Sequence, residues 1–119
     1  MAALKVVHAL ALATVHAAVV NKLEKQFVQL RWGHHEWTMR PTPMCKASND
    51  PSCFGMPSGH AEFATITLGL LYLWGVVPPS LAVIGILLMG LQRVLWNRHT
   101  VLQVVIGTLI GYFYVILYQ

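Results

Sequence analysis

Four long apolar runs dominate the chain, and polar or turn-forming segments separate them. The runs lie at about residues 4–20, 61–77, 80–96 and 100–118. Each is about 17 to 19 residues long, near the length that a helix needs to cross the hydrocarbon core of a bilayer. The runs are apolar on all faces rather than along one stripe, as in lipid-embedded helices. We therefore predict an all-α fold, an integral membrane bundle of four transmembrane helices.

The connections between the runs fit one bundle. Lys5 and the helix-favouring continuation NKLEKQFVQL favour a retained first span over a cleaved signal peptide. The paired prolines of VVPPS predict a tight turn between the second and third spans, and residues 31–56 form the one long polar loop. Gly107 and Gly111 form a GxxxG pair suited to close helix contact. Residues 1–119 are interpreted as a single membrane-embedded domain.

Composition supports the membrane interpretation and limits the partners. The chain is 56% hydrophobic and only 10% charged, whereas a soluble domain carries about a quarter charged residues. The net charge is +4, but no soluble fold presents a basic face, so we predict no nucleic acid partner. The predicted partners are the lipid bilayer and a membrane lipid phosphate, and a homo-oligomer stays open.

The stretch GMPSGHAE interrupts this apolar pattern where the second run begins. Pro57 fits a helix start, because the first amides of a helix have no intrahelical partner. We expect Ser58 and Gly59 to leave backbone N–H groups free at the positive helix end, a site for an anion such as phosphate. His60 would lie beside the anion and move a proton near neutral pH. A plain helix cap followed by a stray histidine explains the same residues.

Folding the chain back and forth across a bilayer gathers its chemical residues on one face. This face receives Arg40, residues 57–60, Arg93 and His99, whereas Lys5, the proline turn and Gln119 lie opposite. Arginine presents a planar fork to phosphate oxygens, and two histidines can divide the nucleophile and acid roles. Gln103 lies one helical turn after His99, so its carbonyl can accept the proton of one ring nitrogen and orient the other for attack.

Metal ligands are scarce in the sequence. We find no carboxylate pair or aspartate cluster for magnesium, and the adjacent His34, His35 and Glu36 rarely converge on one ion. The sequence therefore predicts a mechanism with no metal and no cofactor. His8 and His16 of the first span are expected to share a helix face and to form hydrogen bonds inside the bundle.

These residues resemble the type 2 phosphatidic acid phosphatases. That family carries Lys-x6-Arg-Pro, then Pro-Ser-Gly-His, then Ser-Arg-x5-His-x3-Asp, and here MRP, PSGH and QRVLWNRH stand in that order. The strings GMPSGHAEF and HTVLQVVIG are most similar to the dolichyl-diphosphatase-like branch, in which glutamine is usual at the position of Gln103. The family core has six spans, so the chain looks like a minimal four-span version. Gly33 and Gln92 depart from the family lysine and serine, and Lys25 or Arg31 would supply the missing cation.

The resemblance implies a metal-independent phosphatase of lipid phosphates or diphosphates, with polyprenyl or dolichyl diphosphate-like or phosphatidate-like substrates. It implies that His99 is the nucleophile that becomes phosphorylated and that His60 is the acid and later the base. Phosphate binding is implied for Arg40, Ser58, Gly59, Arg93 and, as the substitute cation, Lys25. The alternative is a catalytically weak relative that binds lipid phosphates, which the departures from the motif motivate.

The side of the membrane that holds the site is open to two interpretations. Seven of the eight lysines and arginines lie on the site face, which the positive-inside rule places in the cytoplasm. A disulfide between Cys45 and Cys53 and the dolichyl-type resemblance favour the lumen of the endoplasmic reticulum or a related membrane. We expect a lumenal site.

Overall fold

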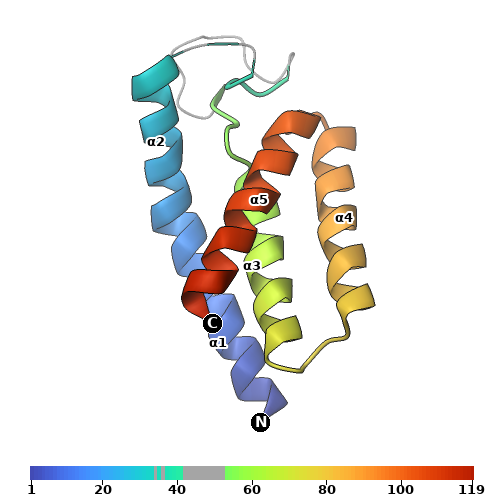
Figure 1. Ribbon diagram of the computed structural model, residues 1–119. Coiled ribbons are helices and arrows are strands. Elements are labelled where there is room, and N and C mark those ends of the chain that lie inside the picture. Colours follow the sequence, from blue (N-terminus) through green and yellow to red (C-terminus); the bar gives the residue numbers. More distant parts are fainter. Residues whose placement is uncertain (34, 36, 42–52) are drawn as a thin grey trace.

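The computed structural model describes residues 1–33, 35, 37–41 and 53–119, and in these residues all regular elements are helices (Figure 1). The helices are α1 (Ala2–Val15), the π-helical turn η1 (His16–Val20), α2 (Asn21–Trp32), α3 (Gly59–Leu73), α4 (Pro79–Leu95) and α5 (Val101–Tyr118). One isolated antiparallel bridge joins Met39 to Phe54 in the described part of the loop. The prediction of an all-α fold is confirmed.

The first three elements form one continuous helix from Ala2 to Trp32. The continuation of the first helix beyond its apolar run is thereby confirmed. Inside this helix, the backbone N–H of Asn21 donates to the carbonyl oxygen of His16, five residues earlier. This π-helical bond places residues 16 and 21 closer to one face than an α-helix would, since an α-helix turns about 100° per residue.

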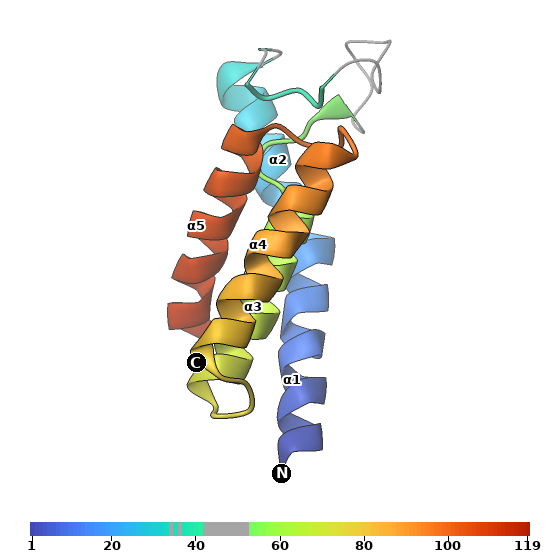
Figure 2. The same cartoon turned by 90° about the vertical axis from the view of Figure 1, so that its right-hand side faces the viewer.

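Helix α3 is the centre of the bundle, and α1, α4 and α5 surround it (Figures 1 and 2). Its side chains Ile66 and Leu70 are fully buried and pack with Ala9 and Ala13 of α1 and Val115 of α5. Small residues on α1 and branched residues on α3 let these helices approach closely. The proline turn after α3 reverses the chain into α4, as the sequence predicts.

Two glycines set the approach of α5 to α3. A Cβ atom on Gly107 would lie 2.7 Å from the backbone oxygen of Ser58, and one on Gly111 would lie 2.8 Å from the Cβ of Thr65. These distances leave no room for a side chain, so the GxxxG pair serves helix packing. The close approach brings the start of α5 next to the start of α3.

Among the described residues, two helices are long and apolar enough to cross a membrane. They are Ala2–Trp32 and Val101–Tyr118, and only 17% and 22% of their most apolar windows are buried inside the protein. Such exposed apolar surface fits contact with lipid rather than a soluble core. Helix α4 is apolar but shorter, so the count of four spans stays a prediction.

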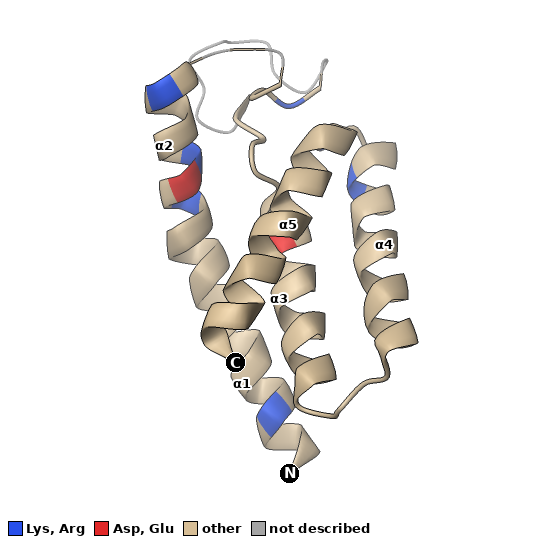
Figure 3. Cartoon of the chain, in the orientation of Figure 1, with Lys and Arg blue, Asp and Glu red and all other residues tan. Residues whose placement is uncertain are grey.

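Charge is sorted along the bundle axis (Figure 3). Lysines and arginines gather toward the loop end, whereas Lys5 lies at the opposite end and its Nζ donates to the carbonyl of Trp74. His16 is buried in the bundle and hydrogen-bonded, as expected. His8 is exposed and stacks on Trp74 instead, because eight residues of α-helix leave an offset of about 80°.

We expect Gly107→Ala to lower the free energy of unfolding by about 1–3 kcal/mol, because the new Cβ meets a backbone that cannot rotate away. Gly85→Ala is the matched control on α4, where the nearest atom is the tip of the flexible Leu68 side chain. Chemical denaturation of both variants in detergent compares them. A Gly107→Ala protein as stable as Gly85→Ala would contradict this packing argument.

Candidate active site

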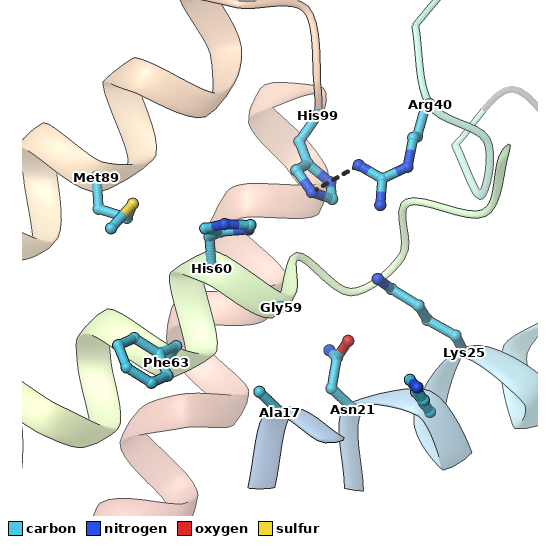
Figure 4. A pocket seen from close by; sticks show the side chains of 10 residues that line it. Ala17, Asn21, Lys25, Arg40, Gly59, His60, Phe63, Met89 and His99 are labelled. Atoms are coloured by element: carbon cyan, nitrogen blue, oxygen red, sulfur yellow. Dashed lines mark hydrogen bonds between the residues drawn. The ribbon is translucent and has the colours of Figure 1, made fainter. Parts of the chain in front are cut away.

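A cavity of about 450 Å³ opens at the loop end of the bundle, between α2, α3 and α4 (Figure 4). Its walls are formed by Ala17, Asn21, Lys22, Lys25, Arg40, Gly59, His60, Phe63, Met89 and His99. These lining residues include three cations and no carboxylate. The cavity therefore favours an anion, and its apolar residues lie at the side that faces down the bundle.

His99 lies in the turn between α4 and α5 and is 2% exposed. Its Nδ1 lies 3.0 Å from the carbonyl oxygen of Gly55 and 3.2 Å from Oε1 of Gln103. Both partners are acceptors, so Nδ1 carries the proton. Nε2 then accepts a hydrogen bond from Nη1 of Arg40 at 3.1 Å with its single lone pair, and both side chains line the cavity. The geometry fits a nucleophile held in one tautomer.

Gln103 is fully buried and orients His99 from behind. Its Nε2 donates to the carbonyl oxygens of Trp37, at 3.2 Å, and Met39, at 2.7 Å. These two bonds fix the amide so that Oε1 faces His99 Nδ1 and the N–H of Thr100. The predicted contact of the glutamine carbonyl with the histidine ring is therefore present. The amide also ties the long loop to α5, which the helical spacing alone does not reveal.

Positive charge surrounds His99. Burial, followed by the nearby Arg40 and Lys25, lowers the pKa of His99 to about 3, against the smaller opposing effect of its hydrogen bonds. Burial and the charges of Arg93 and Arg98 also lower the pKa of Arg40. Arginines that repel one another in a poorly solvated place gain from binding a dianion between them. The electrostatics of the site therefore fit phosphate.

Arg93 lies on the last turn of α4, beyond the residues that line the cavity. Its charge acts on both Arg40 and His60. Its Nε atom is buried and has no hydrogen-bond partner in the described structure. A buried guanidinium nitrogen of this kind can bind a phosphate oxygen after a small rotation of the side chain.

Lys25 on α2 points into the cavity, as Figure 4 shows, whereas Arg31 is not part of its lining. Gly33, at the position of the family lysine, ends α2 with φ +72°, a conformation that favours glycine. A lysine at this helix end would be strained. Lys25 is therefore the better placed of the two substitute cations, and the neighbouring Lys22, which sequence analysis did not name, joins it.

The start of α3 differs in part from the expectation. Ser58 is fully buried and does not line the cavity, its N–H donates to the carbonyl oxygen of Gln103 at 3.2 Å, and its side chain accepts from the N–H of Ala61. The expectation of a free Ser58 amide is wrong, because helix capping and the contact with α5 use both groups. Gly59 and His60 line the cavity, and their amides have no acceptor among the described residues. The anion site at this helix end is reduced to these two amides.

The His60 side chain lies in the cavity beside His99, with Phe63 and Met89 on its other side (Figure 4). Within the described part of the chain, its imidazole has no hydrogen-bond partner. A histidine without a protein partner is free to exchange a proton with a bound molecule.

A second polar cluster, which the sequence pattern did not predict, lies directly behind the cavity. His16, Glu24 and Glu62 come together with their ligand-type atoms within 4.8 Å of one another, although no carboxylate pair was expected. Glu62 is far from His16 and Glu24 in the sequence, and the three residues meet only because α3 packs against the first helix in the folded protein. Asn21 connects the cluster to the cavity wall. His34, Glu36 and Cys45 lie outside the described residues, whereas Cys53 is buried and disulfide-bonded.

Comparison with known proteins shows the family to which the chain belongs. A profile of the PAP2 superfamily matches residues 3–119, and the chain belongs to this family. The chain is also 44% identical over 59 residues to the lipid A 4'-phosphatase of Helicobacter pylori strain J99. That match covers 49% of this chain and 30% of the relative, so the chain spans well under two thirds of that protein. No solved structure matches the chain significantly.

The protonation of His99 gives a direct test of the site geometry. We expect its imidazole to stay neutral, with the proton on Nδ1, as the pH falls from about 8 to about 5, because its pKa is lowered to about 3. The ¹⁵N shifts of histidine-labelled protein report the charge and the tautomer, and a His99→Gln variant assigns the signal. Titration of His99 near pH 6.5 would refute the described environment.

Proposed function

We propose that the protein is an integral membrane phosphatase that hydrolyses lipid phosphates or diphosphates through a phosphohistidine, without a metal ion or other cofactor. The observation that carries the proposal is the unprotonated Nε2 of His99, which Arg40 contacts and which faces the same cavity as His60. Membership of the PAP2 superfamily and the lipid A 4'-phosphatase relative support this chemistry. Four membrane-spanning helices, with α3 and α4 as the two short ones, are part of the proposal.

The reaction uses the two histidines in turn. His99 Nε2 attacks the phosphorus, and the bond to the leaving oxygen breaks as protonated His60 donates its proton to that oxygen. Neutral His60 then takes a proton from water, whose oxygen attacks the phosphorus. The phosphorus–nitrogen bond breaks, its electron pair returns to Nε2, and inorganic phosphate leaves with both histidines restored.

Cations and amides would stabilise the transferring phosphoryl group. Lys25, Arg40 and Arg93 approach from three different segments, and the free amides of Gly59 and His60 add two donors. Donors fixed in this way stabilise the charge that develops in the transition state. Because no carboxylate lines the described cavity, we propose that turnover continues in the presence of EDTA.

The proposed substrate class rests on the apolar helices, the motif resemblance and the lipid A 4'-phosphatase relative. Polyprenyl or dolichyl diphosphates and phosphatidates remain the proposed substrates from the motif resemblance, and the name of the relative adds lipid A as a candidate. The disulfide bond of Cys53 supports a site in an oxidising compartment, such as the lumen of the endoplasmic reticulum. Phosphate release from a panel of these lipids identifies the preferred leaving group.

A catalytically weak relative that binds lipid phosphates is the second candidate. One observation favours it: Arg40 Nη1 contacts Nε2 of His99 at 3.1 Å, at the place where the phosphorus would bond. Arg40 also donates to the carbonyl of Arg98 at 2.9 Å, so it must shift toward the phosphate before attack. Phosphate binding without phosphate release by the purified protein would support this candidate.

We expect His99→Ala to abolish phosphate release, because the phosphorylated nitrogen is lost. His60→Ala should slow formation of the phosphoenzyme or trap it, since the second step needs a base to activate water. Rapid-quench experiments with ³²P-labelled lipid in EDTA measure both steps. Full activity of His99→Ala would overturn the assignment of the nucleophile.

We expect Gln103→Leu to lower turnover about 10- to 1,000-fold, because His99 loses the acceptor that orients it. KM should change much less, since the cations of the cavity remain. The matched control is Thr108→Val on the same helix, whose hydroxyl donates to the carbonyl of Val104 in its own helix. Wild-type turnover in Gln103→Leu would show that Gly55 alone orients the ring.

A further inference from the structure

A chain of buried hydrogen bonds links the far end of α5 to the wall of the phosphate cavity. Tyr118 Oη lies 3.0 Å from His16 Nδ1, and His16 Nε2 contacts Oε1 of Glu62. The second carboxylate oxygen, Oε2, accepts from Nδ2 of Asn21 at 2.8 Å. His16, Glu62 and Asn21 are 1%, 0% and 4% exposed. Buried groups that are hydrogen-bonded to one another in this way are held in one arrangement.

The π-helical turn of the first helix makes this arrangement possible. The bond from the N–H of Asn21 to the carbonyl of His16 places both side chains on the face that meets α3. Each side chain then takes one oxygen of the Glu62 carboxylate. An ordinary α-helix would separate positions 16 and 21 by about 140°, and one carboxylate could not reach both. Single π-turns occur often at functional sites.

Asn21 also contacts the turn that leads into α3. Its Nδ2 also donates to the carbonyl oxygen of Pro57 at 3.3 Å. Its Oδ1 lies 2.9 Å from the point where a Cβ of Gly59 would be, so the two segments touch. Asn21, Gly59 and His60 line the same cavity. The carboxylate of Glu62 therefore fixes, through Asn21, the position of the first turn of α3.

We propose that Glu62 and Asn21 are positioning residues of the phosphate site. Glu62, held by His16, locks Asn21 against Pro57 and Gly59, so that the amides of Gly59 and His60 and the His60 imidazole face the phosphoryl group. This inference rests on the proposed function and adds residues that the motif does not contain. A displacement of catalytic groups by about 1 Å can cost about 100-fold in rate, so we expect loss of the hydrogen bonds between Glu62 and Asn21 to lower the rate.

Because Glu62 acts through hydrogen bonds to His16 and Asn21, we expect different outcomes for two substitutions of its carboxylate. In Glu62→Gln the amide oxygen still accepts from Asn21, and the amide nitrogen donates to His16 Nε2 after a change of tautomer, with Tyr118 accepting from Nδ1. In Glu62→Leu both contacts disappear. Positioning therefore requires rescue by glutamine, whereas a role of the charge in proton transfer would fail in both variants.

The experiment compares Glu62→Gln, Glu62→Leu and Asn21→Ala with the control Thr65→Val, a buried position on α3 whose hydroxyl donates to the carbonyl of Ala61 in the same helix. Each purified protein is tested for kcat, KM and thermal midpoint, and for orthovanadate affinity by calorimetry. We expect Glu62→Leu and Asn21→Ala to lose about 100-fold in kcat and in orthovanadate affinity, with little change in KM. Glu62→Gln should keep at least about a third of both, and Thr65→Val should match the wild type.

Wild-type orthovanadate affinity in a folded Glu62→Leu or Asn21→Ala protein would overturn the inference, as would equal damage by glutamine and leucine at position 62. If Glu62→Leu does not fold, Asn21→Ala decides alone, because alanine preserves the helix and removes the side-chain bonds to Glu62 and Pro57. Absence of phosphate release by the wild type would reject the proposed function. Orthovanadate binding would then still decide whether Glu62 and Asn21 position the anion site.

Discussion

The side-chain amide of Gln103 is the contact on which the rest of the site depends. The amide nitrogen of this buried side chain contacts acceptors, and its oxygen contacts donors. The nitrogen donates to the carbonyls of Trp37 and Met39 in the loop, so the oxygen must face His99. The glutamine therefore sets the tautomer of the histidine and the position of the loop together. A carboxylate could provide the first function but not the second, because it has no donor for the carbonyls.

The close packing of α3 and α5 carries this contact to the other half of the site. With Gly107 against the backbone of Ser58, the carbonyl of Gln103 accepts the N–H of Ser58. Gln103 thus joins the turn that holds His99 to the turn that precedes His60. The cations enter from α2, α4 and the loop, and their mutual repulsion in a poorly solvated cavity favours a dianion. The arrangement brings Lys25, Arg40 and both histidines to one cavity.

The helices and the grouping of site residues were predictable, because apolar runs and prolines determine the hairpins and spacing determines which helix ends meet. The contact between His99 and Gln103 was predictable because the two residues are one helical turn apart in the sequence. The prediction of a free amide at Ser58 was wrong, because this N–H donates to the carbonyl of Gln103 on α5. The π-turn and the partnership of Glu62 with Asn21 depend on contacts between distant segments, and a histidine and an asparagine five residues apart carry no signal for them. The number of membrane spans does not follow from helix length alone, because two helices among the described residues are long enough to cross a bilayer and α4 is apolar but shorter.

The most direct test of the account is the identity of the phosphorylated nitrogen. Protein quenched during turnover of ³²P-labelled lipid can be hydrolysed in alkali, and the two phosphohistidine isomers can be separated by chromatography. We expect phosphate on Nε2 of His99 alone, because Nδ1 is hydrogen-bonded to Gly55 and Gln103. Phosphate on Nδ1, or on a residue other than His99, would contradict it.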